Sequence, residues 1–433
     1  MKFSSLLCNN LLLLASACYA GKFKSYSDEN NSSDSNIQPK CFKPEYNIYS
    51  AGDLAAISDC TVLSGSLHIT HFDSDSIHMG SIKEIKGDFT VRNISNLIRI
   101  EATSLTSIGG VFELNTLNSL TSLSFPKLES VETMKWQVLP ILTFVNLDTG
   151  IKTINSVIMS DTSLTGFGGF NVETLKTMSI NNNRFLERIE STVSEVTGDL
   201  LIAANARNIK VSLPNLTWVK SMTVKDTEAI NLESLQVIEK SADFSNNKFT
   251  TLHMPKLKSA GHTLSIINNK NLDDIEFDNL SEVGGGLMII DNEKIKKIDF
   301  FPSLKSVGGA IEFHGDITSN HFDDLKIIKG SAILKSSSAV FDCGDWMKNE
   351  VGKVVRGGKV ECGSGKSAKT EVLLVDESGE STQGEPGVND NSKNVSRHES
   401  SIGQKSEANK SRFSLKLAMV IAVYSFSMLL QML

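Results

Sequence analysis

Acidic and histidine residues are the side chains of this chain whose spacing could support catalysis. Two adjacent carboxylate pairs occur, Asp273-Asp274 and Asp323-Asp324. Glycoside hydrolysis needs two carboxyl groups about 5–9.5 Å apart in a cleft. Neighbouring residues of a strand point to opposite faces, and in a turn both are solvated, so neither pair is expected to be catalytic.

Three histidines lie near one another in the first part of the chain, at His68, His71 and His78. The HITH stretch could bring two imidazoles to one loop, but no third ligand of suitable spacing follows it. No Ser–His–Asp or Cys–His arrangement for nucleophilic catalysis is apparent. The sequence predicts a protein that is not an enzyme and that holds no metal or cofactor.

The cysteines are better explained as structural links. Once a cleaved leader is removed, four remain as two pairs of equal spacing, Cys41/Cys60 and Cys343/Cys362. In an oxidising compartment these most simply form two local disulfides. Each closes a loop of about 20 residues, which stabilises the fold by roughly 3 kcal/mol through lost loop entropy. Because 61–342 contain no cysteine, the disulfides should sit at the two ends of that region.

The N-terminal stretch MKFSSLLCNNLLLLASACYA has a basic residue, a short apolar run and small residues, in that order. This pattern predicts a secretory signal peptide over 1–20, cleaved after Ala20, with cleavage after Ala17 as the alternative. An N-terminal membrane anchor is disfavoured, because the run is too short to span ~30 Å of hydrocarbon. A polar leader, 21–40, follows.

The chain ends in a second apolar run, LAMVIAVYSFSMLLQML, at 417–433. Either a transmembrane helix or a glycosylphosphatidylinositol (GPI) attachment signal would have this character. The second is favoured, because the run is short and the neighbouring basic residues all precede it. The expected acceptor is Asn409, with Ser406 as the alternative, and 410–433 would be removed.

The middle of the chain is a repeat. LSIINNKNLDDIEF at 264–277 resembles LMIIDNEKIKKIDF at 287–300, and copies recur about every 22 to 24 residues. Weaker copies begin around 133, 155, 176, 220 and 241, and the pattern is degenerate over 133–170. This period, with apolar-x-apolar triplets and Asn, is typical of leucine-rich repeats and β-helices.

The triplet explains how such a repeat folds. Side chains alternate along a strand, so Leu264 and Ile266 should point inward and Ser265 outward. Two later apolar pairs supply further walls, Ile275 with Phe277 and Leu280 with Val283. Each wall buries its inner face only when coils stack, at roughly 1.5–3 kcal/mol per buried side chain. The sequence predicts a right-handed parallel β-solenoid over 61–342, of leucine-rich-repeat type.

Three residue types are expected at the corners of the coils. Buried asparagine amides could satisfy backbone groups there, and the candidates are Asn182, Asn246, Asn268 and Asn292. Glycine before each strand is expected to allow a positive φ. Proline fits a bend, at Pro126, Pro214, Pro255 and Pro302.

A solenoid needs caps at its ends, and the two disulfide loops lie where caps should be. Residues 41–60 and 343–362 are each expected to contain a short helix. Trp136 and Trp218 are expected to pack within the coils. Trp346 is expected to plug the C-terminal end, with a sugar-stacking platform as the alternative.

Beyond Cys362 the repeat stops, and 363–409 are rich in Ser, Gly, Lys and Glu. This composition predicts a disordered glycosylated stalk, although the apolar VLLV at 372–375 does not fit it. N-glycosylation is predicted at Asn30, Asn31, Asn93, Asn215, Asn279 and Asn394.

In combination these features resemble one family, the fungal GPI-anchored cell-wall glycoproteins needed for wall organisation and, in some members, spore-wall formation. The VGGGLMIIDN and IGGVFELN openings, the FPKLESV and FPSLKSV closings, the cysteine pairs and the C-terminal signal carry the resemblance, over about 41–362 and both termini. It implies receptor-L-domain-like repeats and a role in wall integrity rather than a reaction.

A functional surface is expected on the outward side of the strands, where a solvated sheet is the alternative. Its candidate residues are Glu113, Lys135, Thr223, Ser265, Met288 and Glu312. The expected protein is a secreted glycoprotein on the outer face of the plasma membrane or in the wall, binding wall polysaccharide or wall proteins. The alternatives are a recognition module for a peptide or protein and, last, a glycan-modifying enzyme. The formal net charge of −7 argues against nucleic acid.

Overall fold

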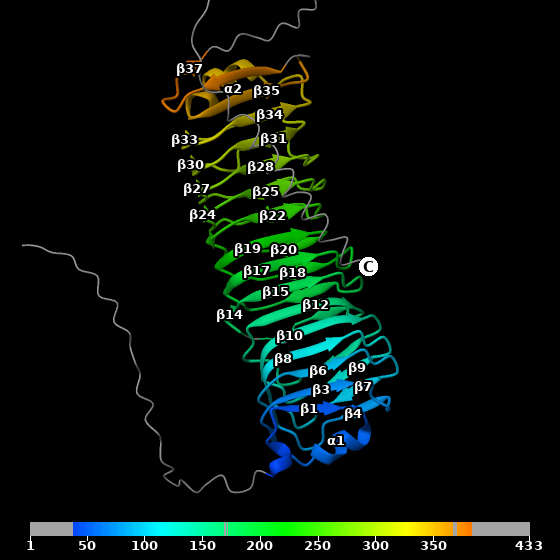
Figure 1. Cartoon of the computed structure of the whole chain (residues 1–433). Coiled ribbons are helices and arrows are strands. Elements are labelled where there is room, and N and C mark those ends of the chain that lie inside the picture. Colours follow the sequence, from blue (N-terminus) through cyan, green and yellow to red (C-terminus); the bar gives the residue numbers. More distant parts are fainter. Residues whose placement is uncertain (1–37, 169, 171, 367–369, 383–433) are drawn as a thin grey trace, which may run out of the picture. The chain divides into compact units, whose positions relative to one another are not determined.

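The computed structural model describes residues 38–168, 170, 172–366 and 370–382. These residues form an elongated stack of parallel β-coils with short helices at its two ends (Figure 1). Both disulfides lie at the ends, Cys41–Cys60 and Cys343–Cys362. The predicted parallel β-solenoid with disulfide-stapled ends is confirmed.

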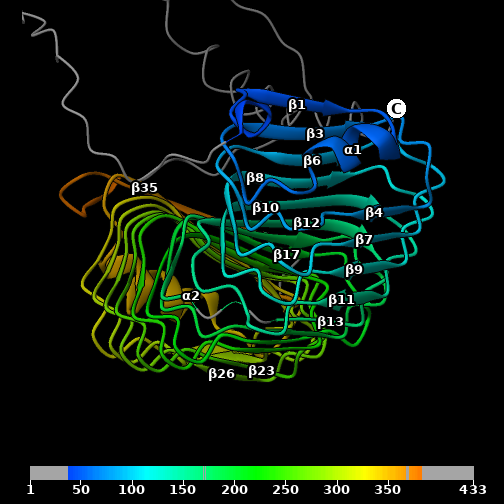
Figure 2. The same ribbon diagram turned by 90° about the horizontal axis from the view of Figure 1, so that it is seen from below.

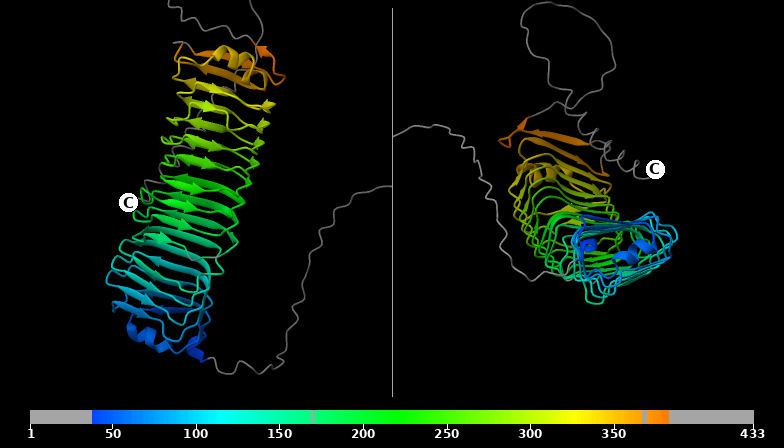
Figure 3. Two further views of the ribbon diagram at one scale, coloured as in Figure 1. Left: turned by 180° about the vertical axis from the view of Figure 1, so that it is seen from behind. Right: turned by 60° about the horizontal axis from the view of Figure 1, so that its bottom comes forward.

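The main wall is built from one strand of every coil, and successive strands pair in parallel (Figure 3). Ser265, for example, lies beside Asp243 of the preceding coil and Met288 of the following one. In chain order the strands are β1 (Glu45–Ile48), β3 (Ser66–Thr70), β6 (Phe89–Arg92), β8 (Ser107–Asn115), β10 (Ser130–Leu139), β12 (Ser156–Thr162), β15 (Thr177–Asn181), β17 (Glu195–Ala203), β19 (Trp218–Lys225), β22 (Ala242–Ser245), β25 (Leu264–Ile267), β28 (Leu287–Ile290), β31 (Ile311–Gly315), β34 (Ala332–Ser336) and β35 (Gly358–Gly363).

A second wall precedes the main wall in each coil and consists of very short strands. The long strands β8, β10, β17 and β19 run through both walls, which therefore belong to one 25-stranded sheet that also includes two strands at the C-terminal end. The remaining strands of this wall are β2 (Val62–Leu63), β5 (Glu84–Ile85), β14 (Thr174–Leu175), β21 (Val237–Ile238), β24 (Ser259–Ala260), β27 (Glu282–Val283), β30 (Ser306–Val307) and β33 (Ile327–Ile328).

The third wall lies on another side of the coils, as the view along the stack shows (Figure 2). It is divided into four small sheets, and its first break lies between β11 and β13, where the sequence repeat is degenerate. Its strands are β4 (Ser76–His78), β7 (Arg99–Glu101), β9 (Ser122–Ser124) and β11 (Phe144–Asn146); β13 (Gly166–Phe167), β16 (Arg188–Glu190), β18 (Lys210–Ser212) and β20 (Ala229–Asn231); β23 (Thr251–His253) and β26 (Asp274–Glu276); β29 (Lys297–Ile298) and β32 (Ser319–Asn320). The main wall continues through the degenerate segment without interruption.

Inward side chains form one continuous apolar core. Leu264 and Ile266 are fully buried, and so is Trp136, whose ring meets Phe112 edge-on at 5.5 Å. Trp218 is half-buried on the outer side of β19. The alternation read from the sequence therefore holds along the strands.

The corner after each main-wall strand differs from the expectation by one residue. A residue in the left-handed region, with φ between 51° and 58°, lies at or just after the C-terminal end of the strand in eleven of the described coils. Asn182, Asn246 and Asn268 occupy this position, so their expected role as buried amides is wrong. The next residue turns inward instead, and of the four candidates only Asn292 does so. The buried amides belong to the neighbouring residues Asn183, Asn247 and Asn269.

The glycines before the strands are explained by close backbone contact between coils. Gly261 and Gly284 do not have positive φ, so the expected reason for glycine at these positions is wrong. A Cβ on Gly261 would lie 2.0 Å from the carbonyl oxygen of Glu239, and one on Gly284 would lie 2.1 Å from that of Gly261. No side chain fits between these coils. The four prolines do lie in turns.

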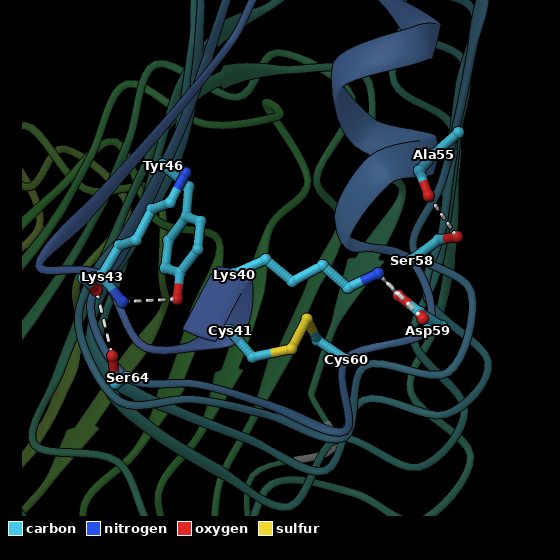
Figure 4. Close-up of a disulfide and its surroundings, with 9 residues drawn as sticks. All are labelled: Lys40, Cys41, Lys43, Tyr46, Ala55, Ser58, Asp59, Cys60 and Ser64. Carbon is cyan, nitrogen blue, oxygen red and sulfur yellow. Dashed lines mark hydrogen bonds and ion pairs between the residues drawn. A yellow bond between two sulfur atoms is a disulfide. The ribbon is translucent and has the colours of Figure 1, made fainter. Parts of the chain in front are cut away.

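The N-terminal cap contains η1 (Pro39–Cys41) and α1 (Ala51–Ile57). Ser50 is the N-cap of α1, and its Oγ accepts a hydrogen bond from the Asp53 amide at 3.2 Å. Beside the disulfide, Lys40 Nζ lies 2.8 Å from the Asp59 carboxylate (Figure 4). The cap thus covers the first coil with one covalent link and one ion pair.

The C-terminal cap contains α2 (Cys343–Lys348) and η2 (Val351–Lys353). Trp346 is buried there, as expected for a plug. Two more strands follow, β36 (Glu371–Val375) and β37 (Ser381–Thr382), and β36 pairs antiparallel with β35. The prediction that a disordered stalk begins at 363 is therefore wrong, because VLLV lies in the ordered strand β36. This strand covers the edge that the last coil would otherwise expose.

Candidate functional site

The six residues expected on the outward face lie in one row of the main wall. Parallel register places them side by side along the stack, one per coil. We call this the outer row, and its members from β3 to β35 are His68, Thr90, Glu113, Lys135, Ile158, Ser179, Leu201, Thr223, Asp243, Ser265, Met288, Glu312, Ile333 and Glu361.

Charges at the N-terminal end of the outer row are already paired. Glu113 is only 5% exposed, although it lies on the outer side of the wall. Its carboxylate contacts the Arg92 guanidinium on one side and Lys135 Nζ, at 3.3 Å, on the other. Glu113 and Lys135 thus form a closed ion-pair cluster and have little capacity left for a ligand.

Charges at the C-terminal end are paired as well. The Glu312 carboxylate lies 3.1 Å from His314 Nε2. The hydrogen bond from the Lys359 ammonium lowers the pKa of Glu361, and the charges of Lys335 and His314 act in the same direction. A groove of about 720 Å³ opens beside this end.

The middle of the outer row is largely neutral. From Ile158 to Met288 its one charged member is Asp243, which pairs with Lys225 at 3.1 Å. The other side chains carry hydroxyl or apolar groups, and Ser265 is only 9% exposed. Such a surface suits a broad, uncharged ligand rather than a small charged one.

No N-glycosylation sequon lies on the outer row. The three predicted glycosylation sites within the described residues, Asn93, Asn215 and Asn279, are all exposed at corners. Asn93 is one of the left-handed residues, and Asn215 and Asn279 lie in turns. Glycans at these positions would leave the face of the main wall open.

Carboxylates of the adjacent aspartate pairs contact basic side chains. Asp273 lies 3.4 Å from Lys294, whereas Asp274 lies 2.9 Å from His253, so the two neighbours have different partners. Asp323 is exposed and lies 2.8 Å from His321.

The first histidines are also separate. His68 Nδ1 lies 2.6 Å from Thr90 Oγ1, and His78 Nδ1 lies 3.0 Å from Glu101. Within the described ranges, no three His, Cys, Asp or Glu residues are grouped so that they could hold a metal ion.

Several predicted features fall outside the described residues. They are the signal peptide, most of the polar leader, the sequons at Asn30, Asn31 and Asn394, and the anchor acceptors Asn409 and Ser406. In the part that the structure describes, no helix is long and apolar enough to cross a membrane.

Similarity to curated proteins is extensive. Sporulation-specific protein 2 of Saccharomyces cerevisiae is 36% identical over 396 residues, which cover 90% of this chain and 78% of that protein. Cell wall mannoprotein PST1 of the same yeast is 32% identical, over 74% of this chain and 72% of that protein. Cell surface GPI-anchored protein ECM33 of Candida albicans is 28% identical, over 73% and 77%. No family model matches the chain. No solved structure matches it significantly.

Proposed function

The chain belongs to the fungal family of cell-surface and cell-wall proteins that includes Sporulation-specific protein 2 and cell wall mannoprotein PST1, and we propose that it organises the cell wall without catalysing a reaction. In this proposal it is a secreted glycoprotein held by a GPI lipid at the outer face of the plasma membrane. The Candida albicans relative is named as a GPI-anchored cell-surface protein, which supports the proposed anchor.

The observation that carries the proposal is the neutral middle of the outer row. Its exposed groups are hydroxyls and aliphatic carbons, which match the hydroxyls and C–H faces of a neutral polysaccharide. The charged members of the row lie mainly toward its two ends, where Glu113 pairs with Arg92 and Glu312 contacts His314. We therefore propose that wall polysaccharide lies along this face and that the protein tethers or aligns it at the membrane.

Sedimentation with insoluble β-glucan, chitin and mannan tests the proposed binding. The full-length protein in detergent should bind one polymer saturably. Thr223→Arg, which places a long cation in the middle of the outer row, should reduce that binding at least tenfold. Ser212→Arg, on the outer side of the third wall, is the matched control and should bind normally. Equal binding by both variants would rule out the outer row.

The anchor has a separate test. A phosphatidylinositol-specific phospholipase should release the protein from membranes. Asn409→Gln should abolish surface retention, whereas Ser406→Ala should leave it intact. Resistance to the enzyme together with an intact C-terminal peptide would contradict the lipid anchor and favour a spanning helix.

A further inference from the structure

Asn320 places an amide at a core position that is apolar in other coils. It lies in β32 beside the fully buried Ile298 of β29. Equivalent inward positions of the other third-wall strands are Ile77, Ile100, Leu123, Val145, Phe167, Ile189, Val211, Ile230, Leu252 and Ile275. The last third-wall strand before the C-terminal cap therefore breaks an otherwise uniform apolar column.

Within the described residues, the Asn320 side-chain amide makes no hydrogen bond of good geometry, although Glu350 lines the same pocket. The Asn320 side chain is only 6% exposed, and both Nδ2 and Oδ1 lack such a bond. Buried amides without partners are rare and costly, whereas an aliphatic side chain would fit this column at no such cost. The exception calls for a ligand that supplies the missing hydrogen bonds.

A pocket of about 340 Å³ lies at this residue, between the third wall and the C-terminal cap. One part of its lining is apolar and comes from both elements, with Phe322 and Leu325 from the last coil and Val351 and Val354 from the cap. Phe322 belongs to an aromatic column, with Phe313 stacked at 6.1 Å.

The remaining lining residues are polar and form the rim of the pocket. Burial and then the neighbouring Asp345 raise the pKa of Glu350, while His321 and the Asn320 amide act in the opposite direction. Asn320 and Glu350 line the same pocket, although no hydrogen bond of good geometry joins them. Asn349 Nδ2 donates to Asp345 Oδ1 at 2.7 Å, so Glu350, which lies at the mouth of the pocket, is the side chain that must turn aside to admit a ligand to the amide.

We propose that this pocket binds one pyranose unit of a neutral glycan. The amide offers one donor and one acceptor side by side, which two neighbouring sugar hydroxyls complement: one accepts from Nδ2 and the other donates to Oδ1. The C–H face of the ring then packs on Phe322, Leu325 and Val354. The volume is at the small end of the range for ligand pockets, about 300–1,000 Å³, as one sugar ring requires.

This site is independent of the outer row, because it lies on the third wall and the cap rather than on the main wall. The outer row would hold the length of a polymer, whereas the pocket would hold a single ring. Either site can fail experimentally without the other.

Saturation-transfer NMR and calorimetry on the full-length protein in detergent test the pocket, with short β-glucan, mannan and chitin oligosaccharides as separate probes. One series should bind saturably. Asn320→Leu, which restores the apolar column, should weaken that binding at least tenfold and also raise Tm by about 1–3 °C. Ser319→Ala, at the exposed neighbour in β32, should change neither quantity.

Asn320→Ala provides a second variant that needs less space, and it should weaken binding equally. Thr223→Arg should leave oligosaccharide binding unchanged, which separates this site from the outer row. The proposal is overturned if none of the three series binds, or if Asn320→Leu binds normally. A lower Tm for Asn320→Leu would also overturn it, because the amide would then have a structural role.

Discussion

The same corner of the coil is built in two ways in the two halves of the solenoid. In the first coils, the residue after the left-handed position is apolar and buried, at Phe72, Ile94, Leu117 and Leu139. In the later coils it is a polar residue, at Asn183, Asn205, Thr227, Asn247, Asn269 and Asn292. We call the first set the apolar column and the second the asparagine ladder.

Leu117 of the apolar column and the asparagine ladder pair the backbone amide of this corner differently. In the apolar column, the Leu117 amide donates directly to the Val138 carbonyl of the next coil at 3.1 Å. In the ladder, the Asn247 amide donates to Asn269 Oδ1, and Asn269 Nδ2 donates to the Phe244 carbonyl, both at 2.9 Å. Each ladder amide therefore replaces one backbone bond with two side-chain bonds.

Thr162 marks the junction between the two halves. Its amide and its hydroxyl both donate to Asn183 Oδ1, at 3.0 and 2.8 Å, so it begins the ladder from the apolar side. The contrast teaches that a solenoid corner does not require asparagine. At Leu117 a direct backbone bond pairs the corner amide, and in the ladder an asparagine side chain does so.

Exchanging residue types between the columns should have the largest effect. Asn269→Leu leaves the Asn247 amide and the Phe244 carbonyl unpaired, and Leu117→Asn buries an amide without a partner while losing apolar contacts. Each should reduce the free energy of unfolding by about 3–5 kcal/mol, measured by urea unfolding. Leu117→Met is the mild control. A loss below 1 kcal/mol for Asn269→Leu would show that the ladder is not essential.

A smaller change is expected from Asn205→Thr. Thr227 shows that a hydroxyl can occupy the ladder, because its Oγ1 donates to the Lys225 carbonyl and its amide to Asn247 Oδ1. Threonine at 205 should therefore retain part of the pairing, with a loss of about 1–2 kcal/mol in the same urea experiment. A cost equal to that of Asn269→Leu would mean that every rung needs the amide.

The left-handed position offers a stabilising change in the apolar half. Val138 is β-branched and has φ of 55°, whereas most later coils have Asn or Asp there. Because valine fits this region poorly, Val138→Asn should raise the free energy of unfolding by about 0.5–1 kcal/mol. The reverse variant, Asn246→Val, should lower it by a similar amount. Opposite signs would contradict a strain at Val138.

The smallest effect concerns the N-terminal cap and pH. The hydrogen bond from the Lys40 ammonium lowers the pKa of Asp59, whose unfolded-state pKa is about 3.9. The stabilisation is present above that pH and is lost as the pH falls through the lower folded-state value. Lys40→Gln should thus shift the urea midpoint slightly at pH 6 and not at all near pH 2. Because the pair is exposed, high salt should also remove the shift.

The sequence predicted much of this architecture because the repeat spacing and the alternation of side chains act locally. The outer row, the prolines in turns and the buried Trp136 follow from those two regularities. The two regularities do not predict which asparagine of an adjacent pair turns inward, because a left-handed residue interrupts the alternation. The glycine role also escaped, since it depends on the distance between coils rather than on the local turn. Asn320 could have been found by aligning ITSNHF with IKKIDF, which sets the amide against Ile298.

Complementation of a deletion strain tests whether the face of the main wall carries the function. In the fungus deleted for this gene, sensitivity to wall stress should be rescued by the wild-type chain and by Ser212→Arg. Thr223→Arg, at equal surface abundance, should not rescue growth. Full rescue by Thr223→Arg would contradict the claim and move the functional surface elsewhere on the solenoid.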